Sequence, residues 1–500
     1  MTNESTPKGH DEFQSELIVG LVGAVGTEVR QVVEFLTERL ELAGYKVELV
    51  KVSNDVIPLC GPISFDPENQ YDRIDKMMDA GNDAREKAKD SGVLANGVAA
   101  LIYQQRPKNG NGESAPNFRR VYIVDSLKTP KEVDQLRKIY PGGFVLVGIH
   151  SEKSRRLKNL VENRGITNED AERLIERDGE EKLRPYGQRL NKTFHLADFF
   201  VRITENRERL RSDIRRMVEI WFGNPHLTPT FDEFAMFMAF SSALRSADLS
   251  RQVGAVIARD NTILATGAND CPKFGGGLYW PERDKRGVIC DIENSRDYMR
   301  DGDQNRIEQL GIIDEIVKSC NTTPIDADEL RGALEKSRLS DLTEFGRVVH
   351  AEMEALLACG RTGTPTMGGT LYSTTFPCHN CAKHIVAAGI RRVVYIEPYP
   401  KSRAIDFHND SITTTPGPEK TKVQFVPFVG IGPRRYFELF SMSGFNTYPL
   451  IRKNSETGVP VNWAIEKAKL RVKMLPDSYL GFELEASNKF ENVIQEGTDI

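Results

Sequence analysis

Two short motifs restrict how this chain can fold: HAE at residues 350–352 and PCHNC at residues 377–381. They hold one imidazole, on His350, and two thiols, on Cys378 and Cys381, and these are groups that zinc prefers. Three protein ligands leave the fourth tetrahedral position open, which distinguishes catalytic from closed structural zinc sites. Because the ligands are far apart in sequence, the fold has to bring two separate segments together around one metal ion.

The chain around the two motifs is expected to form a helix, a strand and a second helix. Residues 347–358 (RVVHAEMEALLA) have the apolar spacing of an amphipathic helix, which would place His350 in its first turn. Residues 371–376 (LYSTTF) are typical of a strand, and residues 381–388 (CAKHIVAA) of the next helix. Both thiols would then lie at the start of that helix, whose positive end stabilises thiolates.

Glu352 is the predicted proton carrier because it follows His350 by two residues. Zinc with an open position activates a water molecule, and one carboxylic acid can move a proton from that water to a ring nitrogen and then to leaving ammonia. His-x-Glu followed by Pro-Cys-x-x-Cys is the signature of the zinc nucleobase deaminases. Taken alone, a Cys-x-x-Cys pair is also found in structural zinc sites and in redox pairs. The neighbouring His379 and His384 lack ligand spacing and are expected to be surface or packing residues.

A glycine-rich segment near the N-terminus has the setting of a phosphate-binding loop. Residues 17–22 are an apolar run typical of a buried strand, residues 23–28 (GAVGTE) would form the turn, and residues 29–42 have helical spacing. In such a loop, backbone N–H groups and a helix start hold an anion. The Lys that contacts the phosphates is missing, because Thr and Glu follow Gly26. Phosphoryl transfer is therefore not expected, which leaves nucleotide or phosphate binding, or a tight structural turn.

The predicted residues of this loop are Gly20, Gly23, Gly26 and Thr27. Asp125 ends a further predicted strand at residues 119–125 (RRVYIVD), where a carboxylate could hold Mg²⁺ beside a bound nucleotide. The alternative for Asp125 is an ordinary loop acid or helix cap. Repeated alternation of strands and helices through this part of the chain predicts an α/β domain with a parallel sheet and helices on both faces.

The length of the chain predicts two domains after a short tail. Residues 1–15 are polar and expected to be disordered, residues 16–224 to form the degenerate P-loop domain, and residues 225–500 to form a second domain with an α/β/α arrangement. The boundary is placed at a Gly-Asn-Pro sequence (residues 223–225), which stops a helix. Within the second domain, residues 273–345 have the composition of an insertion, which we expect near the active site.

Charge and cysteine content argue against several classes of function. The formal net charge is −5, and a protein that grips polynucleotide backbones is usually basic, so no stable DNA binding is expected. The seven cysteines and the lack of a secretory signal favour reduced thiols and a cytoplasmic location. No apolar run approaches the roughly 20 residues of a membrane-spanning helix, so no membrane association is expected. Cys271, Cys290 and Cys320 match no ligand template, so a second metal site is not favoured.

Several polar residues are candidates for substrate contacts. Asn269 follows a predicted strand and is a candidate ligand for a sugar hydroxyl, the alternative being a turn residue beside Pro272. The candidate phosphate ligands are Lys401, Arg403, Arg434 and Arg435. For each of these cations the alternative is an ordinary solvated surface position.

At these residues the chain resembles the cytidine and deoxycytidylate deaminase superfamily. The resemblance is carried by RQVGA at residues 251–255, by residues 267–272, by HAE and by TTFPCHNC. The two-domain layout, with YPKS at residues 399–402 and GIGPRRYFELF at residues 430–440, is similar to the bacterial anti-phage dCTP deaminases, in which a P-loop kinase-like domain precedes the deaminase.

This resemblance implies a zinc enzyme that deaminates free deoxycytidine nucleotides, dCTP and also dCMP, and thereby depletes the dCTP pool during phage infection. It also implies a cytidine-deaminase-like fold for the second domain, a homo-oligomer, and a regulatory role for the N-terminal domain, where we expect a regulatory nucleotide. Two alternatives stay open at this point. One is a DNA- or RNA-editing deaminase, and the other is a non-enzymatic nucleotide sensor in which zinc is structural.

Overall fold

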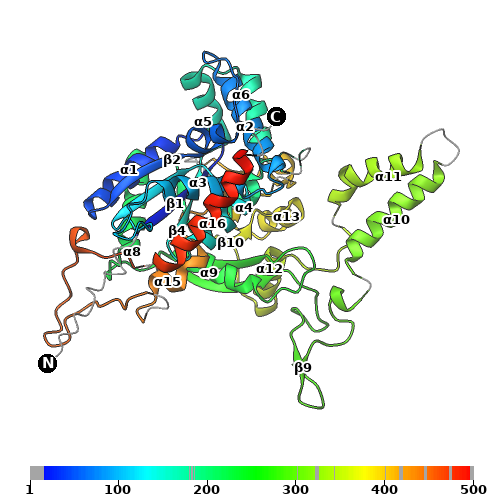
Figure 1. Ribbon diagram of the computed structural model, residues 1–500. Helices are drawn as coiled ribbons and strands as arrows, with labels where there is room; N and C mark the ends of the chain where they lie inside the picture. The colour runs from blue at the N-terminus through cyan, green and yellow to red at the C-terminus, as the bar shows by residue number, and fades with distance from the viewer. Residues whose placement is uncertain are drawn as a thin grey trace. The chain divides into compact units, whose positions relative to one another are not determined.

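The computed structural model describes residues 16–495 except 180, 182–183, 185, 301, 321–325, 343, 400, 416–420, 444–446, 472–473 and 475. Figure 1 traces the chain from blue at its N-terminus to red at its C-terminus. The chain divides into two compact units. The first joins Met1–Glu233 to Val429–Ile500, and the second is Phe234–Phe428. The predicted disordered tail at residues 1–15 lies outside the described residues.

The first unit is built on a six-stranded sheet in the order β14-β5-β4-β1-β3-β2. Its strands are β1 (Leu17–Gly23), β2 (Lys46–Lys51), β3 (Arg120–Asp125), β4 (Phe144–His150), β5 (Phe199–Arg202) and β14 (Gly430–Ile431). The first five pair in parallel, and β14 pairs antiparallel with β5. All seven residues of β1 are buried, as expected for a parallel strand covered on both faces. The predicted parallel α/β sheet is therefore confirmed.

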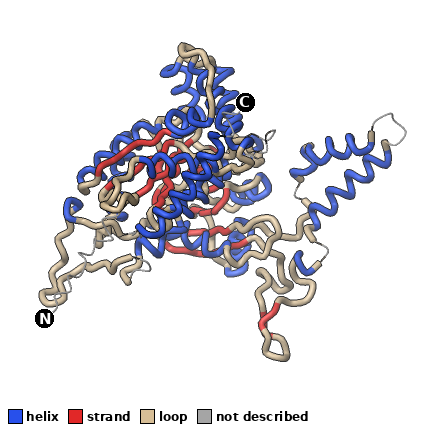
Figure 2. Tube along the Cα trace, in the orientation of Figure 1, coloured by secondary structure: helices blue, strands red, loops and turns tan. Residues whose placement is uncertain are grey.

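Helices cover this sheet, as Figure 2 shows with strands in red and helices in blue. The helices of this unit are α1 (Val29–Leu42), α2 (Gln70–Lys87), α3 (Val93–Gln104), α4 (Pro130–Ile139), α5 (Lys153–Lys158), α6 (Asn168–Gly179), α7 (Leu190–Phe194), α8 (Arg207–Trp221), α15 (Tyr436–Phe440) and α16 (Pro476–Gln495). One core joins Leu21 of β1 to Leu36 of α1 and Ile214 of α8. In another layer, α4 contacts β4 and α16 packs on α3.

After residue 428 the chain returns to the first unit, which corrects the predicted second domain of residues 225–500. β14 extends the sheet beside β5, and α16 packs on α3. In this layer the Arg106 side chain is fully buried, and it pairs at 2.6 Å with Glu16 and at 2.5 Å with Glu483 of α16. A buried guanidinium without such partners is strongly destabilising. The C-terminal helix therefore belongs to the first unit because it completes the charge pairing of that core.

The second unit contains a six-stranded sheet in the order β12-β13-β11-β10-β6-β7. Its strands are β6 (Gly254–Arg259), β7 (Thr262–Ala268), β10 (Thr370–Thr375), β11 (Arg392–Glu397), β12 (Ile412–Thr413) and β13 (Val423–Pro427). The last four run parallel to one another, whereas β6 is antiparallel to both β10 and β7. The accompanying helices are α9 (Phe231–Ala243), α12 (Ala351–Thr362), α13 (His379–Ala387) and α14 (Ala404–Phe407).

Two glycines let helices pack closely on this second sheet. A Cβ atom on Gly254 would lie 1.9 Å from the carbonyl oxygen of Ala239 in α9, and one on Gly267 would lie 2.1 Å from the carbonyl oxygen of Ala351 in α12. No side chain fits at these distances, so the helices approach the strands only because both positions are glycine. This packing places the first turn of α12, which carries Glu352 and directly follows His350, against β7.

The predicted insertion at residues 273–345 forms the segment between β7 and α12. It contains β8 (Glu282–Arg283), β9 (Ile289–Cys290), α10 (Gln304–Ser319) and α11 (Ala327–Lys336). Two ion pairs connect this segment to the residues that flank it: Arg296 with Asp270 at 3.5 Å, and Asp297 with Arg347 at 2.6 Å. Its predicted place near the active site stays a prediction.

Candidate active site

His350 lies immediately before α12 and caps that helix in an extended conformation. The prediction of a helix from residue 347, with His350 in its first turn, is therefore wrong by one turn. The reason is an antiparallel bridge between Val349 and Asp270, in which the Val349 N–H donates to the Asp270 carbonyl oxygen at 3.0 Å. This bridge holds the chain extended up to His350, so the imidazole projects from a fixed end of the helix.

Cys378 occupies the matching position before α13. Its Sγ accepts the backbone N–H of Cys381 at 3.5 Å, so the thiol itself caps the helix. The helix begins at His379, two residues earlier than the sequence predicts. Both sulfurs therefore lie at the positive end of α13, as predicted, where a thiolate is stabilised.

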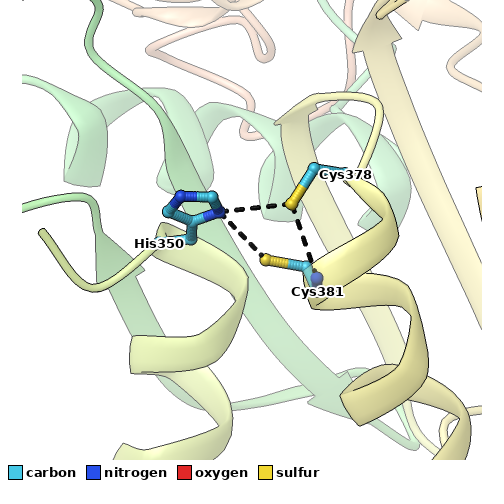
Figure 3. Close-up of side chains that lie close together, drawn as sticks. All are labelled: His350, Cys378 and Cys381. Atoms are coloured by element: carbon cyan, nitrogen blue, oxygen red, sulfur yellow. Dashed lines mark hydrogen bonds between the residues drawn. The ribbon is translucent and has the colours of Figure 1, made fainter. Parts of the chain in front are cut away.

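The three predicted ligands face one another (Figure 3). Nδ1 of His350 lies 3.3 Å from Sγ of Cys378 and 3.4 Å from Sγ of Cys381. A tetrahedral zinc ion with bonds of about 2.0–2.3 Å needs ligand atoms roughly 3.6 Å apart, so the spacing fits zinc. Among the residues that the structure describes, these three form the one group of three or more His, Cys, Asp or Glu side chains close enough to hold a metal ion.

The protonation of the group also suits a metal. The hydrogen bond from Cys381, together with the nearby His350, lowers the pKa of the Cys378 thiol, and the hydrogen bond with Cys378 raises the pKa of His350. A thiolate is thus already favoured beside the imidazole. Zinc binds deprotonated ligands, so its binding would release the remaining protons of the group.

Glu352 lies in the first turn of α12 with its side chain turned toward the same group. Its Oε2 is 3.5 Å from Sγ of Cys381, and its Oε1 accepts a hydrogen bond from the Ser373 hydroxyl at 3.1 Å. The residue is only 4% exposed. Burial, and to a smaller extent the nearby Cys378 sulfur, raises the pKa of the Glu352 carboxyl, which suits a group that must take up and release a proton. Sequence reasoning missed Ser373, because a serine within a strand carries no signal of its own.

Asn269 directly precedes Asp270, which bridges Val349 beside His350, but the Asn269 side chain is engaged with the backbone. Its Oδ1 accepts the N–H of Val253 at 2.7 Å, and its Nδ2 donates to the carbonyl oxygen of Arg251 at 2.9 Å. The residue is buried and ties the end of β7 to the segment that enters β6. The observed role is therefore structural, and the contact with a sugar hydroxyl stays a prediction.

The four candidate phosphate ligands are divided between the two units. Lys401 and Arg403 belong to the second unit, and Arg403 pairs with Asp406 at 2.6 Å. Arg434 and Arg435 belong to the first unit. Arg435 donates to the carbonyl oxygen of Phe144 at 2.6 Å, and also pairs with Asp198 and Glu438. These contacts correct the prediction that Arg435 binds phosphate. The Arg435 side chain instead stabilises the packing of the first unit.

The glycine-rich loop has the predicted strand and helix on either side. Gly20, however, is an interior residue of β1, where a Cβ atom would lie 2.8 Å from the ring of Phe144. It is thus a packing residue and no part of the loop, which corrects that prediction. Gly23 ends the strand, and Gly26 has a φ of +82°, the left-handed conformation that a tight turn requires of glycine.

Asp178 of α6 occupies a position at this loop where a bound anion would be expected. Its Oδ2 accepts the N–H of Val25 at 2.6 Å, and its Oδ1 pairs with Nζ of Lys128 at 2.7 Å. The amide of Asn159 donates to the carbonyl oxygen of Gly26 at 2.7 Å. The loop is therefore satisfied in part by side chains of its own chain, and its binding of a nucleotide stays a prediction.

Two further residues of the predicted loop site have specific surroundings. Thr27 is buried, and its hydroxyl has no hydrogen-bond partner among the described residues. Burial raises the pKa of the Asp125 carboxyl, an effect that Lys128 and Lys51 oppose. Asp125 belongs to no group of three or more metal-binding side chains in the described chain, so the predicted Mg²⁺ finds no support.

The remaining cysteines and the apolar character of the helices can also be described. Cys271 is buried with its Sγ 3.5 Å from the Asp297 carboxylate, Cys290 is exposed, and neither they nor Cys320 join a metal-binding group of the described residues. Among the described helices, none combines the length and apolar character needed to cross a bilayer.

Comparison with known proteins agrees with the geometry. Residues 229–397 match the family model described as the cytidine and deoxycytidylate deaminase zinc-binding region. The deoxycytidylate deaminase of Enterobacteria phage T4 is 31% identical over 168 residues, which cover 33% of this chain and 77% of the phage protein. The deoxycytidylate deaminase of Mycobacterium phage D29 is 29% identical over 170 residues, covering 33% of this chain and 94% of that protein.

Among solved structures, similarity is found to the dCMP deaminase of the cyanophage S-TIM5 in complex with dCMP and dUMP. It shares 20% sequence identity, covers 41% of this chain and 100% of that chain, and has a TM-score of 0.23. The family match includes His350, Glu352, Cys378 and Cys381, so the residues that the geometry brings together are the ones in the matched region.

Proposed function

This chain belongs to the deoxycytidylate deaminase family, and from that premise we propose that it deaminates free deoxycytidine nucleotides, dCTP and also dCMP, to the corresponding uracil nucleotides. In this hydrolysis, water adds across the N3–C4 bond of cytosine, with its oxygen on C4 and a proton on N3. The bond between C4 and the amino nitrogen then breaks and ammonia leaves. The oxygen stays on C4 as the carbonyl of uracil.

One observation carries the proposal: the Glu352 carboxylate lies beside a His/Cys/Cys group that has the spacing of zinc ligands. When bound there, zinc supplies a Lewis acid that makes a water molecule nucleophilic near neutral pH. His350, Cys378 and Cys381 would hold the ion and leave a fourth position open. A purely structural zinc site has four protein ligands and needs no buried carboxylate beside it.

Glu352 is the group that moves protons in this proposal. Its Oε2 lies on the side of the metal ligands, where it can accept a proton from the attacking water. The same oxygen then delivers that proton to N3, and takes the second proton of the water to the departing ammonia. Burial of the carboxyl favours its protonated form midway through this cycle, because a charge is costly there.

A free nucleotide is the preferred substrate because the chain carries a net charge of −5, which disfavours gripping a polynucleotide. Within the second unit, Lys401 and Arg403 are the proposed contacts for the phosphates, and Asn269 for the sugar. Arg434 remains a candidate contact for a phosphate, but we propose no particular phosphate group for it.

The remaining proposals rest on the resemblance of the two-domain layout to bacterial anti-phage dCTP deaminases. We propose that the protein acts in the cytoplasm as a homo-oligomer and depletes the dCTP pool during phage infection. We further propose that the P-loop-like first unit binds a regulatory nucleotide through Gly23, Gly26 and Thr27. A phosphate there would have to displace the Asp178 carboxylate from the Val25 N–H.

The test is to incubate the zinc-loaded full chain with dCTP, dCMP, CTP, CMP and a deoxycytidine-containing single-stranded oligonucleotide, and to measure ammonia together with the uracil product. We expect product from the free deoxynucleotides and none from the oligonucleotide. Deamination of the oligonucleotide alone would replace the proposal by an editing deaminase. A zinc-loaded protein that converts no substrate would replace it by a sensor with structural zinc.

A further inference from the structure

The two oxygens of the Glu352 carboxylate have different surroundings. Oε2 lies 3.5 Å from Sγ of Cys381, on the side of the metal ligands. Oε1 accepts a hydrogen bond from the Ser373 hydroxyl at 3.1 Å. A carboxylate that carries protons at a defined point has to present one oxygen steadily, so the group that holds the other oxygen affects the reaction directly.

Ser373 lies in the middle of the deaminase sheet. It belongs to β10, where it pairs with Ala255 of β6 on one side and Tyr395 of β11 on the other. It is fully buried, with no exposed surface. Its strand partner Ala255 belongs to the hydrophobic core of this unit, as does Leu371 of the same strand. A serine hydroxyl in such surroundings must find partners within the protein, because an unsatisfied buried polar group costs about 1–3 kcal/mol.

The direction of the Ser373 hydroxyl is set from two sides. Its oxygen receives the backbone N–H of Thr375 at 3.4 Å, a long contact within the same strand. That contact occupies a lone pair and leaves the single hydroxyl proton for the Glu352 carboxylate. Ser373 is placed by a central strand and Glu352 by the first turn of α12, so both ends of the hydrogen bond are on regular elements.

We propose that Ser373 is a positioning residue for the deamination, which holds Oε1 of Glu352 so that Oε2 stays turned to the metal ligands as the oxygen that carries the proton. The inference rests on the proposed function. Its physical basis is the loss of rotational freedom: without the hydroxyl, the carboxyl group can turn about its last side-chain bond and its proton-carrying oxygen is no longer fixed.

The expected effect follows from what comparable supporting groups contribute. Hydrogen bonds that orient the groups of a metal site are typically worth about 10–100-fold in activity or metal affinity. Ser373 contacts Glu352 and none of the three metal ligands in the hydrogen bonds described, so the effect should fall on kcat. KM and zinc content should change little.

The test compares Ser373→Ala with wild type, both loaded with zinc, by measuring kcat, KM and bound zinc. We expect kcat to fall by roughly 10–100-fold at nearly constant KM and full zinc content. Ser373→Thr, which restores the hydroxyl, should recover most of the lost kcat. The matched control is Thr374→Ala, because Thr374 is the next residue of β10 and its hydroxyl accepts the Gly254 N–H at 3.1 Å instead of contacting Glu352.

Three results would overturn the inference: an unchanged kcat in Ser373→Ala, a loss of zinc in parallel with the loss of activity, or an equal loss of kcat in Thr374→Ala. The activity of the wild type distinguishes failure of the positioning role from failure of the proposed function. An active wild type with an unaffected Ser373→Ala removes only the positioning role. A zinc-loaded wild type that is inactive on every cytosine nucleotide removes both.

Discussion

The His/Cys/Cys group of the second unit and the glycine-rich loop of the first unit differ in whether their binding groups already have partners within the protein. At the first, three potential metal ligands face one another with a carboxylate beside them. At the second, the N–H of Val25 is taken by the Asp178 carboxylate, and Lys128 pairs with the same group. Both places are recognisable from short motifs, yet only one presents its reactive groups to a common point.

This difference comes from the kind of group that each motif supplies. The metal motif consists of imidazole and thiol side chains. When such side chains lie close together, metal binding is the main function that they serve, so the motif predicts the kind of site closely. A phosphate loop works mainly through backbone N–H groups, which any anion can use, including a carboxylate of the same chain. A motif of the second kind therefore predicts an anion site without saying whether the anion is a ligand or part of the protein.

The largest effect is expected when a metal ligand is removed. Cys378→Ala should lose zinc and abolish measurable deamination, because we expect the thiolate to bind the metal in addition to capping α13. Bound zinc by elemental analysis and product formation would be measured together. Cys290→Ala is the matched control, since Cys290 is exposed and outside the metal group. Full zinc retention in Cys378→Ala would refute the ligand set.

A smaller effect is expected at the loop. Asp178→Asn should destabilise the first unit by about 1–3 kcal/mol, because it leaves Lys128 without its buried charge partner. Zinc content and the basal kcat should stay at wild-type values. Urea unfolding followed by tryptophan fluorescence is suitable, because Trp221 is buried in the core of this unit and the partly buried Trp463 packs against that core.

The control for that prediction is Glu172→Gln, which changes an exposed carboxylate on the same helix, α6. An unchanged unfolding midpoint in Asp178→Asn would mean that the carboxylate contributes nothing to the loop, and the contrast between the two sites would be lost. A fall in zinc content would instead show that the two sites are not independent.

Local features of the fold were predictable where nearby residues determine them. The helix at residues 29–42 has the predicted bounds, and the three candidate zinc ligands lie close together. The start of α12 was predicted one turn too early because the bridge from Val349 to Asp270 overrides the helical pattern of the local sequence. Such a bridge joins segments that are distant in the chain, so no local pattern reveals it.

Longer-range features could not be predicted for the same reason. The C-terminal helix joins the first unit through Glu483 and Arg106, which are 377 residues apart. Gly20 looked like a loop residue because it lies in a glycine-rich segment, but the ring of Phe144 in the neighbouring strand is what requires glycine there. The hydrogen bond between Ser373 and Glu352 joins a strand to a helix, so it depends on tertiary packing that the local sequence does not predict.

The most direct test of the account is the deaminase activity of Glu352→Gln, loaded with zinc and assayed on dCTP and dCMP beside the wild type. Glutamine keeps the shape of the side chain but cannot carry the proton. We predict full zinc content and a fall in product formation of about 10²–10⁴-fold. Turnover close to that of the wild type in the zinc-loaded variant would contradict the central claim that Glu352 moves the proton at this metal site.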